Sequence, residues 1–221
     1  MTFPKVIYFC NKTLDKMVIY SNNWKKLNPD YQIKLYDDSL CKRFLLKKFG
    51  KLHYEIFNFL KDGPIRADFW RICILYLYGG VYSDIDNEPL KSIDSFVEEG
   101  VDFVTCSSYW RYNFNPNFII TSKQSPILKK CIDWYIDTYN SKVEYSYWKY
   151  SIMNCFTQTL HLTNYNKEQP GIYEFSNLRV QIIKELPGKN HYDAHNVYNG
   201  VRIFNNRYST WDSDNHCFKN D

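Results

Sequence analysis

The 221-residue sequence lacks several patterns that identify common classes of protein. It has neither a G-x-G-x-x-G fingerprint nor a phosphate-binding P-loop, which argues against nicotinamide-dependent enzymes and kinases. It also lacks the nucleophile elbow of serine hydrolases. No Lys/Arg block is long enough to predict a nucleic-acid-binding arm, although the net charge is +4. This modest positive balance fits an anionic small substrate, an anionic membrane surface or plain solubility.

Long apolar segments and paired cysteines are missing as well. The seven cysteines include no C-x-x-C pair, and an odd number in a chain of this size predicts buried free thiols in a reducing compartment. The longest nearly apolar run, from Ile72 to Tyr82, is too short to cross a bilayer and contains Gly79-Gly80. The N-terminus shows no signal-peptide pattern. We therefore expect a soluble cytoplasmic chain that contacts a membrane at most peripherally; an anchor in a longer precursor stays open.

Aromatic residues are abundant instead, at 19% of the sequence with 20 tyrosines. Tyrosine offers a flat apolar face and a polar tip, which suits sugars and bases. An AT-biased genome would produce the same enrichment, so composition alone does not separate these two explanations. The length and the absence of linkers or repeats predict one domain over residues 1–221.

Hydrophobic periodicity predicts strands that alternate with helices. The expected helices cover 13–27, 39–49, 52–60, 66–78, 126–139 and 147–159, and the expected strands cover 5–10, 31–36, 81–83, 102–106, 179–186 and 198–204. This order predicts an α/β fold with a mostly parallel mixed sheet flanked by helices. Residues 205–221 are expected to form a C-terminal loop. In such sheets ligands bind at the carboxyl ends of strands.

Two aspartates stand at one such strand end. Asp84 and Asp86 follow the short strand expected at 81–83, and an extended segment would place both side chains on one face. Two carboxylates at such a short distance repel each other unless a cation lies between them. Carboxylate oxygens are hard ligands, which suit Mg²⁺ or Mn²⁺. The pattern alone is weak, because a second copy, Asp212-Ser213-Asp214, occurs in the polar tail, where we expect a solvated surface.

The helix that precedes these aspartates carries Asp68 and Arg71 three positions apart, and therefore on one helical face. A carboxylate beside a guanidinium can accept from and donate to neighbouring sugar hydroxyls. The alternative is an ordinary ion pair on the helix surface. His191 and His195 are four apart but lack a third ligand, so we expect surface histidines in a loop.

A family resemblance supports the reading of this region. The run from Arg66 to Asp86, RADFWRICILYLYGGVYSDID, resembles glycosyltransferase family 32, whose members have a sugar-binding region containing a DXD motif. It is also similar to the large clostridial glucosylating toxins and to the yeast initiating α-1,6-mannosyltransferases. The resemblance covers about the first 130 residues, with segments FPKVIY near the N-terminus and NPDY at 28–31 in support.

The resemblance implies a GT-A fold, a single nucleotide-sugar-binding domain and a divalent ion, Mn²⁺ or alternatively Mg²⁺. It implies that Asp86 binds the metal directly and that Asp84 contacts the ribose and the water shell of the metal. Asp68 and Arg71 would hold the hydroxyls of the donor sugar. Further donor contacts are expected from Arg66 and Ile85. Related chains have a tryptophan at the end of the first strand that stacks on the base; because it is absent here, Tyr8 or Phe9 is expected to stack on the base instead. In the C-terminal loop, Asn206 and Ser209 would join the metal and Trp211 would cover the diphosphate.

We therefore expect a metal-dependent, retaining glycosyltransferase that moves a hexose from UDP-glucose or UDP-galactose to a glycan, lipid or protein. A GDP-mannose-dependent mannosyltransferase is the alternative within enzymes. A carbohydrate- or nucleotide-binding module without catalysis, and a metal-dependent phosphoesterase, are the alternatives outside this class.

Overall fold

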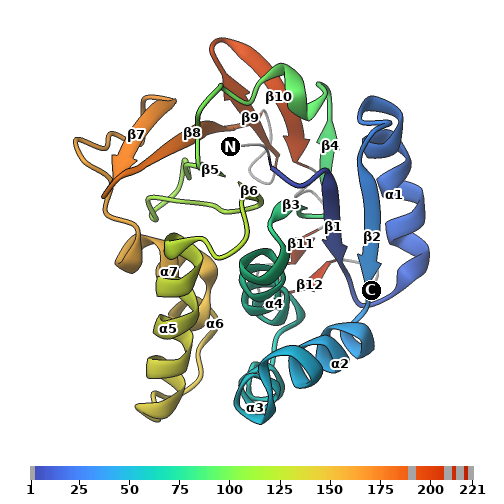
Figure 1. Ribbon diagram of the computed structural model, residues 1–221, viewed down its shortest axis with the longest axis vertical. Helices are drawn as coiled ribbons and strands as arrows, with labels where there is room; N and C mark the ends of the chain where they lie inside the picture. Colours follow the sequence, from blue (N-terminus) through green and yellow to red (C-terminus); the bar gives the residue numbers. More distant parts are fainter. Residues whose placement is uncertain (1–2, 189–192, 207–210, 213–216, 219–221) are drawn as a thin grey trace.

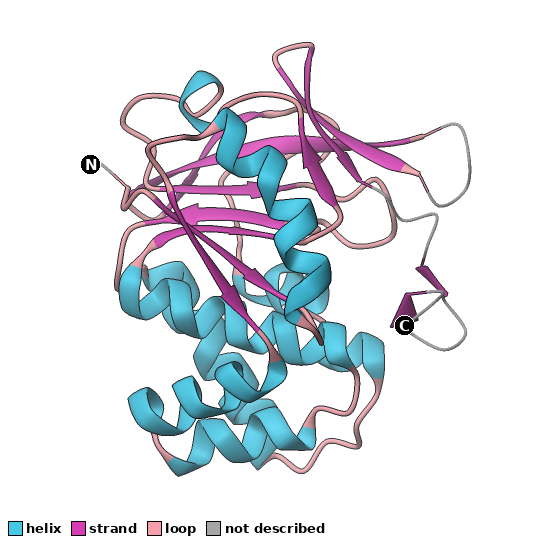
Figure 2. Cartoon of the chain, turned by 90° about the vertical axis from the view of Figure 1, so that its right-hand side faces the viewer, coloured by secondary structure: helices cyan, strands magenta, loops and turns pink. Residues whose placement is uncertain are grey.

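The computed structural model describes residues 3–188, 193–206, 211–212 and 217–218, and side chains are described up to Asn206 except for residues 15 and 16. A ten-stranded mixed sheet forms the centre of this described part, with the strand order β2-β1-β3-β6-β5-β8-β9-β10-β4 and β7 paired to β8. Helices α2 to α7 cover one face of the sheet, and α1 lies on the other face (Figures 1 and 2). None of the described helices is long and apolar enough to cross a bilayer.

The first five helices and five of the strands have about the bounds that the sequence pattern predicts. The helices are α1 (Leu14–Leu27), α2 (Asp38–Phe49), α3 (Lys51–Phe59), α4 (Gly63–Tyr78), α5 (Pro126–Asn140), α6 (Tyr147–Tyr150) and α7 (Ile152–Thr159), with a 3-10 turn, η1 (Ile93–Ser95). The strands of the main sheet are β1 (Val6–Cys10), β2 (Gln32–Tyr36), β3 (Gly80–Ser83), β4 (Asn87–Pro89), β5 (Phe103–Cys106), β6 (Phe118–Thr121), β7 (Gly171–Phe175), β8 (Leu178–Pro187), β9 (Ala194–Tyr198) and β10 (Val201–Asn206). A separate pair, β11 (Trp211–Asp212) and β12 (Cys217–Phe218), follows.

The expectation of a mostly parallel sheet is wrong. Only the pairings β1–β2, β1–β3 and β5–β8 are parallel; the six others in the main sheet are antiparallel. The C-terminal half runs as the meander β8–β9–β10, and antiparallel neighbours need only short turns rather than helical crossovers. The sequence pattern missed β4, β6 and β7, which are short or lie next to irregular segments.

Two single elements of the sequence prediction are each two elements in the structure. The helix expected over 147–159 is interrupted at Ser151, whose backbone is extended and whose hydroxyl caps α7 by accepting from the Asn154 amide at 3.3 Å. The strand expected over 198–204 covers the last residue of β9, the turn with Asn199 and Gly200 at positive φ, and most of β10; the rest of β9 was not predicted. The first residues of the expected C-terminal loop, Asn205 and Asn206, still belong to β10.

Helix α4 packs at the centre of the molecule between the sheet and the helices α3 and α5 (Figure 1). Nine of its side chains are buried, including every position from Asp68 to Leu75, so the helix is enclosed on all sides. Pro64 starts it within the first turn, and the Gly79 amide ends it by donating to the Leu75 carbonyl at 2.7 Å. The long apolar run in the sequence is therefore a core helix followed by a core strand.

Gly79 and Gly80 make the tight connection from α4 to β3. Both have positive φ, at 66° and 101°. A Cβ on Gly79 would lie 2.6 Å from the Lys123 amide nitrogen, and one on Gly80 would lie 2.8 Å from the Val6 carbonyl oxygen. Only glycine fits at both positions, and this connection sets where β3 ends.

Candidate functional site

A cavity of about 430 Å³ opens at the carboxyl ends of β1 and β3. These strands are parallel neighbours, with Tyr8 opposite Tyr82, so the segments that follow them meet at one edge of the sheet. The volume lies within the range of small-molecule sites. The lining residues come from the end of β1, the start of α2, helix α4, the turn after β3, and α6 with the start of α7: Cys10, Asn11, Lys12, Asp38, Gly63, Pro64, Arg66, Ala67, Asp68, Arg71, Tyr82, Asp84, Ile85, Asp86, Asn115, Tyr147, Trp148, Ser151, Ile152 and Met153.

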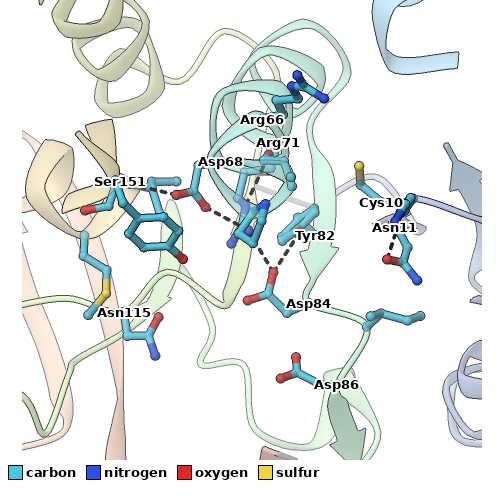
Figure 3. Close-up of a pocket in the computed structure, with 18 of the residues that line it drawn as sticks. Cys10, Asn11, Arg66, Asp68, Arg71, Tyr82, Asp84, Asp86, Asn115 and Ser151 are labelled. Atoms are coloured by element: carbon cyan, nitrogen blue, oxygen red, sulfur yellow. Dashed lines mark hydrogen bonds and ion pairs between the residues drawn. The ribbon is translucent and has the colours of Figure 1, made fainter. Parts of the chain in front are cut away.

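Arg71 is the cation at the centre of this cavity (Figure 3). Its Nη2 lies 2.9 Å from Asp68 Oδ1 and 2.9 Å from Asp84 Oδ1, and its Nη1 donates to the Pro116 carbonyl at 2.8 Å. The guanidinium carbon lies 4.1 Å from the centre of the Tyr82 ring. The side chain is only 5% exposed. The pair of Asp68 and Arg71 is therefore a buried network that includes Asp84, not an ion pair on a helix surface.

Asp68 connects α4 to the start of α7. Its second carboxylate oxygen accepts from the Ile152 amide at 3.0 Å, which is the first amide of that helix. Burial raises the pKa of Asp68 to about 6, although Arg71 and the Ile152 amide act in the opposite direction. Both oxygens thus have protein partners, and the side chain also holds the wall of the cavity in place.

Asp84 and Asp86 lie in the turn between β3 and β4, whereas an extended segment was expected. The Asn87 amide donates to the Asp84 carbonyl at 3.2 Å and closes this turn. Both side chains nevertheless line the same cavity and are directed into it, with Ser151 and Asn115 on one side and Cys10 and Asn11 on the other (Figure 3).

The two carboxylates differ in their partners. Asp84 accepts from Tyr82 Oη at 2.7 Å in addition to its ion pair with Arg71. Burial raises its pKa, and Arg71 and Tyr82 lower it again in part. Burial, followed by the charge of Asp84, raises the pKa of Asp86 to about 7. Within the described residues, no lysine or arginine forms an ion pair with Asp86. Its negative charge is therefore the least compensated in the cavity.

The sequence reasoning missed several residues at this site. Glu185 on β8 is 1% exposed and accepts from Asn115 Nδ2 at 2.7 Å and from Asn206 Nδ2 at 3.3 Å. It thereby lies next to Asn115, which lines the cavity, and its charge adds to the rise of the Asp86 pKa. In the sequence it is one of several polar residues in its strand, beside Arg179, Gln181 and Lys184, so the local pattern gave no signal that distinguished it. Tyr147 and Ser151 reach the cavity from a segment that the pattern presented as one continuous helix.

Arg66 and Ile85 line the cavity, but Tyr8 and Phe9 do not. Phe9 is completely buried against Trp24 under α1, with ring centres 5.9 Å apart, on the opposite face of the sheet. Tyr8 is 2% exposed beside Tyr36. At the end of β1 the cavity wall is formed instead by Cys10, Asn11 and Lys12. Phe9 faces the other side of the sheet, and Tyr8 is on the same face as Cys10 but two residues further from the strand end.

The residues expected in the C-terminal loop are only partly described. Asn206 is buried at the end of β10 and reaches Glu185, which places it beside the aspartate pair. Ser209, the second D-x-D copy beyond Asp212, and His191 lie outside the described residues, and for Trp211 only the backbone in β11 is described. His195 lies in strand β9, so the expectation of a loop is wrong there.

Comparison with protein families matches the region that contains the aspartate pair. The family model described as "Glycosyltransferase sugar-binding region containing DXD motif" matches residues 15–102, which contain α4 and the turn with both aspartates. This part of the chain is therefore similar to the sugar-binding region of DXD-containing glycosyltransferases. The family match therefore covers the same two aspartates that line the cavity.

Individual relatives match parts of the chain. The initiation-specific alpha-1,6-mannosyltransferase of Schizosaccharomyces pombe is 31% identical over 100 residues, or 42% of this chain and 25% of the relative. That of Saccharomyces cerevisiae is 35% identical over 80 residues, or 35% of this chain and 17% of the relative. The chain thus spans a quarter or less of the length of these relatives. The solved structure of PaToxG glycosyltransferase has the same fold, with a TM-score of 0.55, 22% identity, and coverage of 72% of this chain and 68% of that one.

Proposed function

We propose that the chain is the GT-A-type donor-binding domain of a metal-dependent glycosyltransferase, with Asp84 and Asp86 holding a divalent ion against the diphosphate of a nucleotide-sugar. The observation that carries the proposal is the placement of both aspartates on one cavity with Arg71 and Asp68. The cavity lies at the edge of an α/β sheet where parallel strands end.

The residues of the cavity fit a divalent ion. Asp86 is a carboxylate whose ionisation is opposed by burial and by Asp84, so a cation beside it would remove an electrostatic cost. Carboxylate oxygens are the ligands that Mg²⁺ and Mn²⁺ prefer, and these ions take one or two of them together with substrate phosphates. Asn206 and Ser209 are the proposed additional ligands. When bound, the ion supplies positive charge that stabilises the departing diphosphate.

Side chains of this chain perform the other tasks. Arg71 is fixed by two carboxylates and a carbonyl, so its charge is already oriented when the donor enters and needs no reorganisation. Asp68 and Arg66 lie on the α4 side of the cavity, where the hexose hydroxyls are proposed to bind. The nucleoside would lie toward Cys10, Asn11 and Lys12, in the place that sequence reasoning gave to Tyr8 and Phe9.

The donor is proposed to be UDP-glucose or UDP-galactose, and the transfer is proposed to retain the anomeric configuration. GDP-mannose is the second candidate. It is favoured by the similarity to relatives that are named alpha-1,6-mannosyltransferases, one of them 35% identical over 80 residues.

Hydrolysis of nucleotide-sugars tests the function directly. We expect the protein to release sugar from UDP-glucose, UDP-galactose or GDP-mannose only when Mn²⁺ or Mg²⁺ is present. Asp86→Asn should lower this rate about 100-fold or more, the usual effect of removing one charge-stabilising group. The matched control is Asp133→Asn, an exposed carboxylate on α5 that is paired with Lys129 outside the cavity.

Calorimetry separates the other functional classes. A catalytic domain binds UDP or GDP more tightly with Mn²⁺ than without it. Binding of free glycans with no response to nucleotide and metal would indicate a binding module instead. Metal-dependent cleavage of bis-p-nitrophenyl phosphate without cleavage of any nucleotide-sugar would indicate a phosphoesterase and contradict the proposal.

A further inference from the structure

The loop between β5 and β6 connects the centre of the cavity to an exposed part of the surface. Ser107 and Phe114 form an isolated β-bridge across it, and the Asn115 amide donates to the Cys106 carbonyl at 3.0 Å. Its last residues contact the cavity centre, because the Pro116 carbonyl accepts from Arg71 at 2.8 Å. The base of the loop is therefore held by the same arginine that holds Asp68 and Asp84.

The tip of this loop packs against α6 in an aromatic group around one arginine. The Trp110 and Trp148 rings are 5.0 Å apart, and the Tyr112 ring stacks on Trp148 at 6.0 Å. The Arg111 guanidinium lies 5.0 to 5.1 Å from all three ring centres, and its Nη2 donates to Tyr112 Oη at 3.1 Å. Tyr147 extends the group, with its ring 4.9 Å from Trp148. We call these five residues the aromatic platform.

The platform is open to solvent at one end and continuous with the cavity at the other. Trp110 is 45% exposed, which is unusual for the largest apolar side chain. Tyr147 and Trp148 line the cavity itself. They come from the same segment as Ser151, on the opposite side of the aspartates from Cys10 and Asn11 (Figure 3). A molecule on the platform would approach the donor sugar from the side away from the proposed nucleoside.

The chemistry of the platform matches a sugar ring. Its members combine flat apolar faces with hydroxyl, indole and guanidinium donors, and none of the five is aliphatic. A pyranose presents the complementary surface, with a face of C–H groups and a rim of hydroxyls. A lipid tail or an amphipathic helix would instead be matched by an aliphatic groove.

We propose that the aromatic platform binds the acceptor of the reaction and that this acceptor is a glycan, whose sugar ring stacks on Trp110 and Trp148. This inference rests on the proposed glycosyltransferase function. In the transfer, an acceptor hydroxyl oxygen bonds to the anomeric carbon of the donor. The bond from that carbon to the diphosphate breaks, and the diphosphate leaves with the electron pair and takes up the hydroxyl proton.

Two reactions of the same protein separate the platform from the donor site. We would measure metal-dependent hydrolysis of the donor, and transfer of its sugar to a panel of mannose-, glucose- and galactose-terminated trisaccharides. Trp110→Ala should leave hydrolysis unchanged, because Trp110 does not line the cavity. It should raise the acceptor KM about tenfold, which corresponds to about 1.4 kcal/mol, with little change in kcat. Trp110→Phe should restore most of the lost affinity.

The control variant is Tyr20→Ala, which removes an aromatic side chain of similar exposure, 42%, from α1. It should change neither reaction. If the wild type hydrolyses the donor but transfers to none of the trisaccharides, or if Trp110→Ala transfers with unchanged KM, the inference is refuted while the proposed function stands. Transfer to a protein or to lipid vesicles that Trp110→Ala does not weaken also refutes it. Loss of hydrolysis in the wild type would instead refute the proposed function.

Discussion

Replacing Arg71 by methionine tests whether one buried guanidinium holds the cavity together. Methionine keeps the aliphatic bulk but removes both ion pairs and the hydrogen bond to the Pro116 carbonyl. Breaking a buried pair by removing one partner costs about 3–5 kcal/mol, because the remaining charge stays buried. For a domain whose total stability is about 5–15 kcal/mol, this is at least about a fifth of the free energy of unfolding. Donor hydrolysis should be lost as well.

The loss should depend on pH in a defined direction. Asp68 and Asp84 already have raised pKa values, and without Arg71 these values rise further. A carboxyl with a raised native pKa takes up its proton more readily in the folded state, so stability is kept at low pH and lost as pH rises through that pKa. Arg71→Met should therefore be less destabilised at pH 5 than at pH 8.

Urea unfolding followed by circular dichroism measures this effect, with Arg43→Met, an exposed arginine of α2, as the control that stays within about 0.5 kcal/mol. The double variant Arg71→Met/Asp84→Asn should be more stable than Arg71→Met alone, because the uncompensated charge is removed. Arg71→Lys should restore stability only in part, since an ammonium lacks the planar fork that serves Asp68 and Asp84 at once. The reasoning fails if Arg71→Met unfolds at the same urea concentration as the wild type, or if its loss is independent of pH.

Three further outcomes follow from the site and its surroundings. In metal-free protein, Asp86→Asn should raise stability more at pH 8 than at pH 5, because the cost of a pKa raised from 3.8 to about 7 grows between these two values and reaches at most about 4 kcal/mol above them. Equal effects at pH 5 and pH 8 would contradict the burial of Asp86. Gly79→Ala should lower the free energy of unfolding by about 2 kcal/mol or more, because Gly79 has a positive φ and the new Cβ would lie 2.6 Å from the Lys123 amide nitrogen. A thermal midpoint equal to that of the wild type would show that this connection tolerates a Cβ. Iodoacetamide should label Cys10, which is partly exposed in the cavity, faster than the buried Cys41. Peptide mass spectrometry should show that nucleotide and Mn²⁺ together protect Cys10 from labelling. If nucleotide does not change the labelling of Cys10, the nucleoside binds elsewhere.

Local signals in the sequence were enough for the elements that lead to the site. Periodicity, Pro64 and the glycine pair predicted helix α4 and strand β3, and both are confirmed, although the helix begins at Gly63, three residues earlier than expected. These signals act within a few positions along the chain: a proline begins a helix, and a glycine with positive φ ends it. The same kind of signal failed where elements are short, as at β4 and β6, because strands of three or four residues depend on neighbours that the local pattern does not contain.

The topology of the sheet was not predictable in this way. Alternating strands and helices suggested parallel pairing, whereas most neighbours are antiparallel. Pairing is decided by contacts between residues far apart in the sequence, such as Glu185 on β8 and Asn115 in the loop before β6, which are 70 positions apart. A pattern read along the chain carries no information about which of two distant strands becomes a neighbour.

By itself, then, the sequence determined that a helix rich in apolar residues ends at two glycines and delivers Asp84 and Asp86 at the end of a strand, because covalent geometry and side-chain periodicity act locally. Only the tertiary structure decided that Asp68, Arg71 and Asp84 form one buried network, that Tyr8 and Phe9 point elsewhere, and that α6 adds Tyr147 and Trp148 to the wall of the cavity. Burial, and with it the strength of each charge and the identity of each neighbour, exists only once distant segments have packed together.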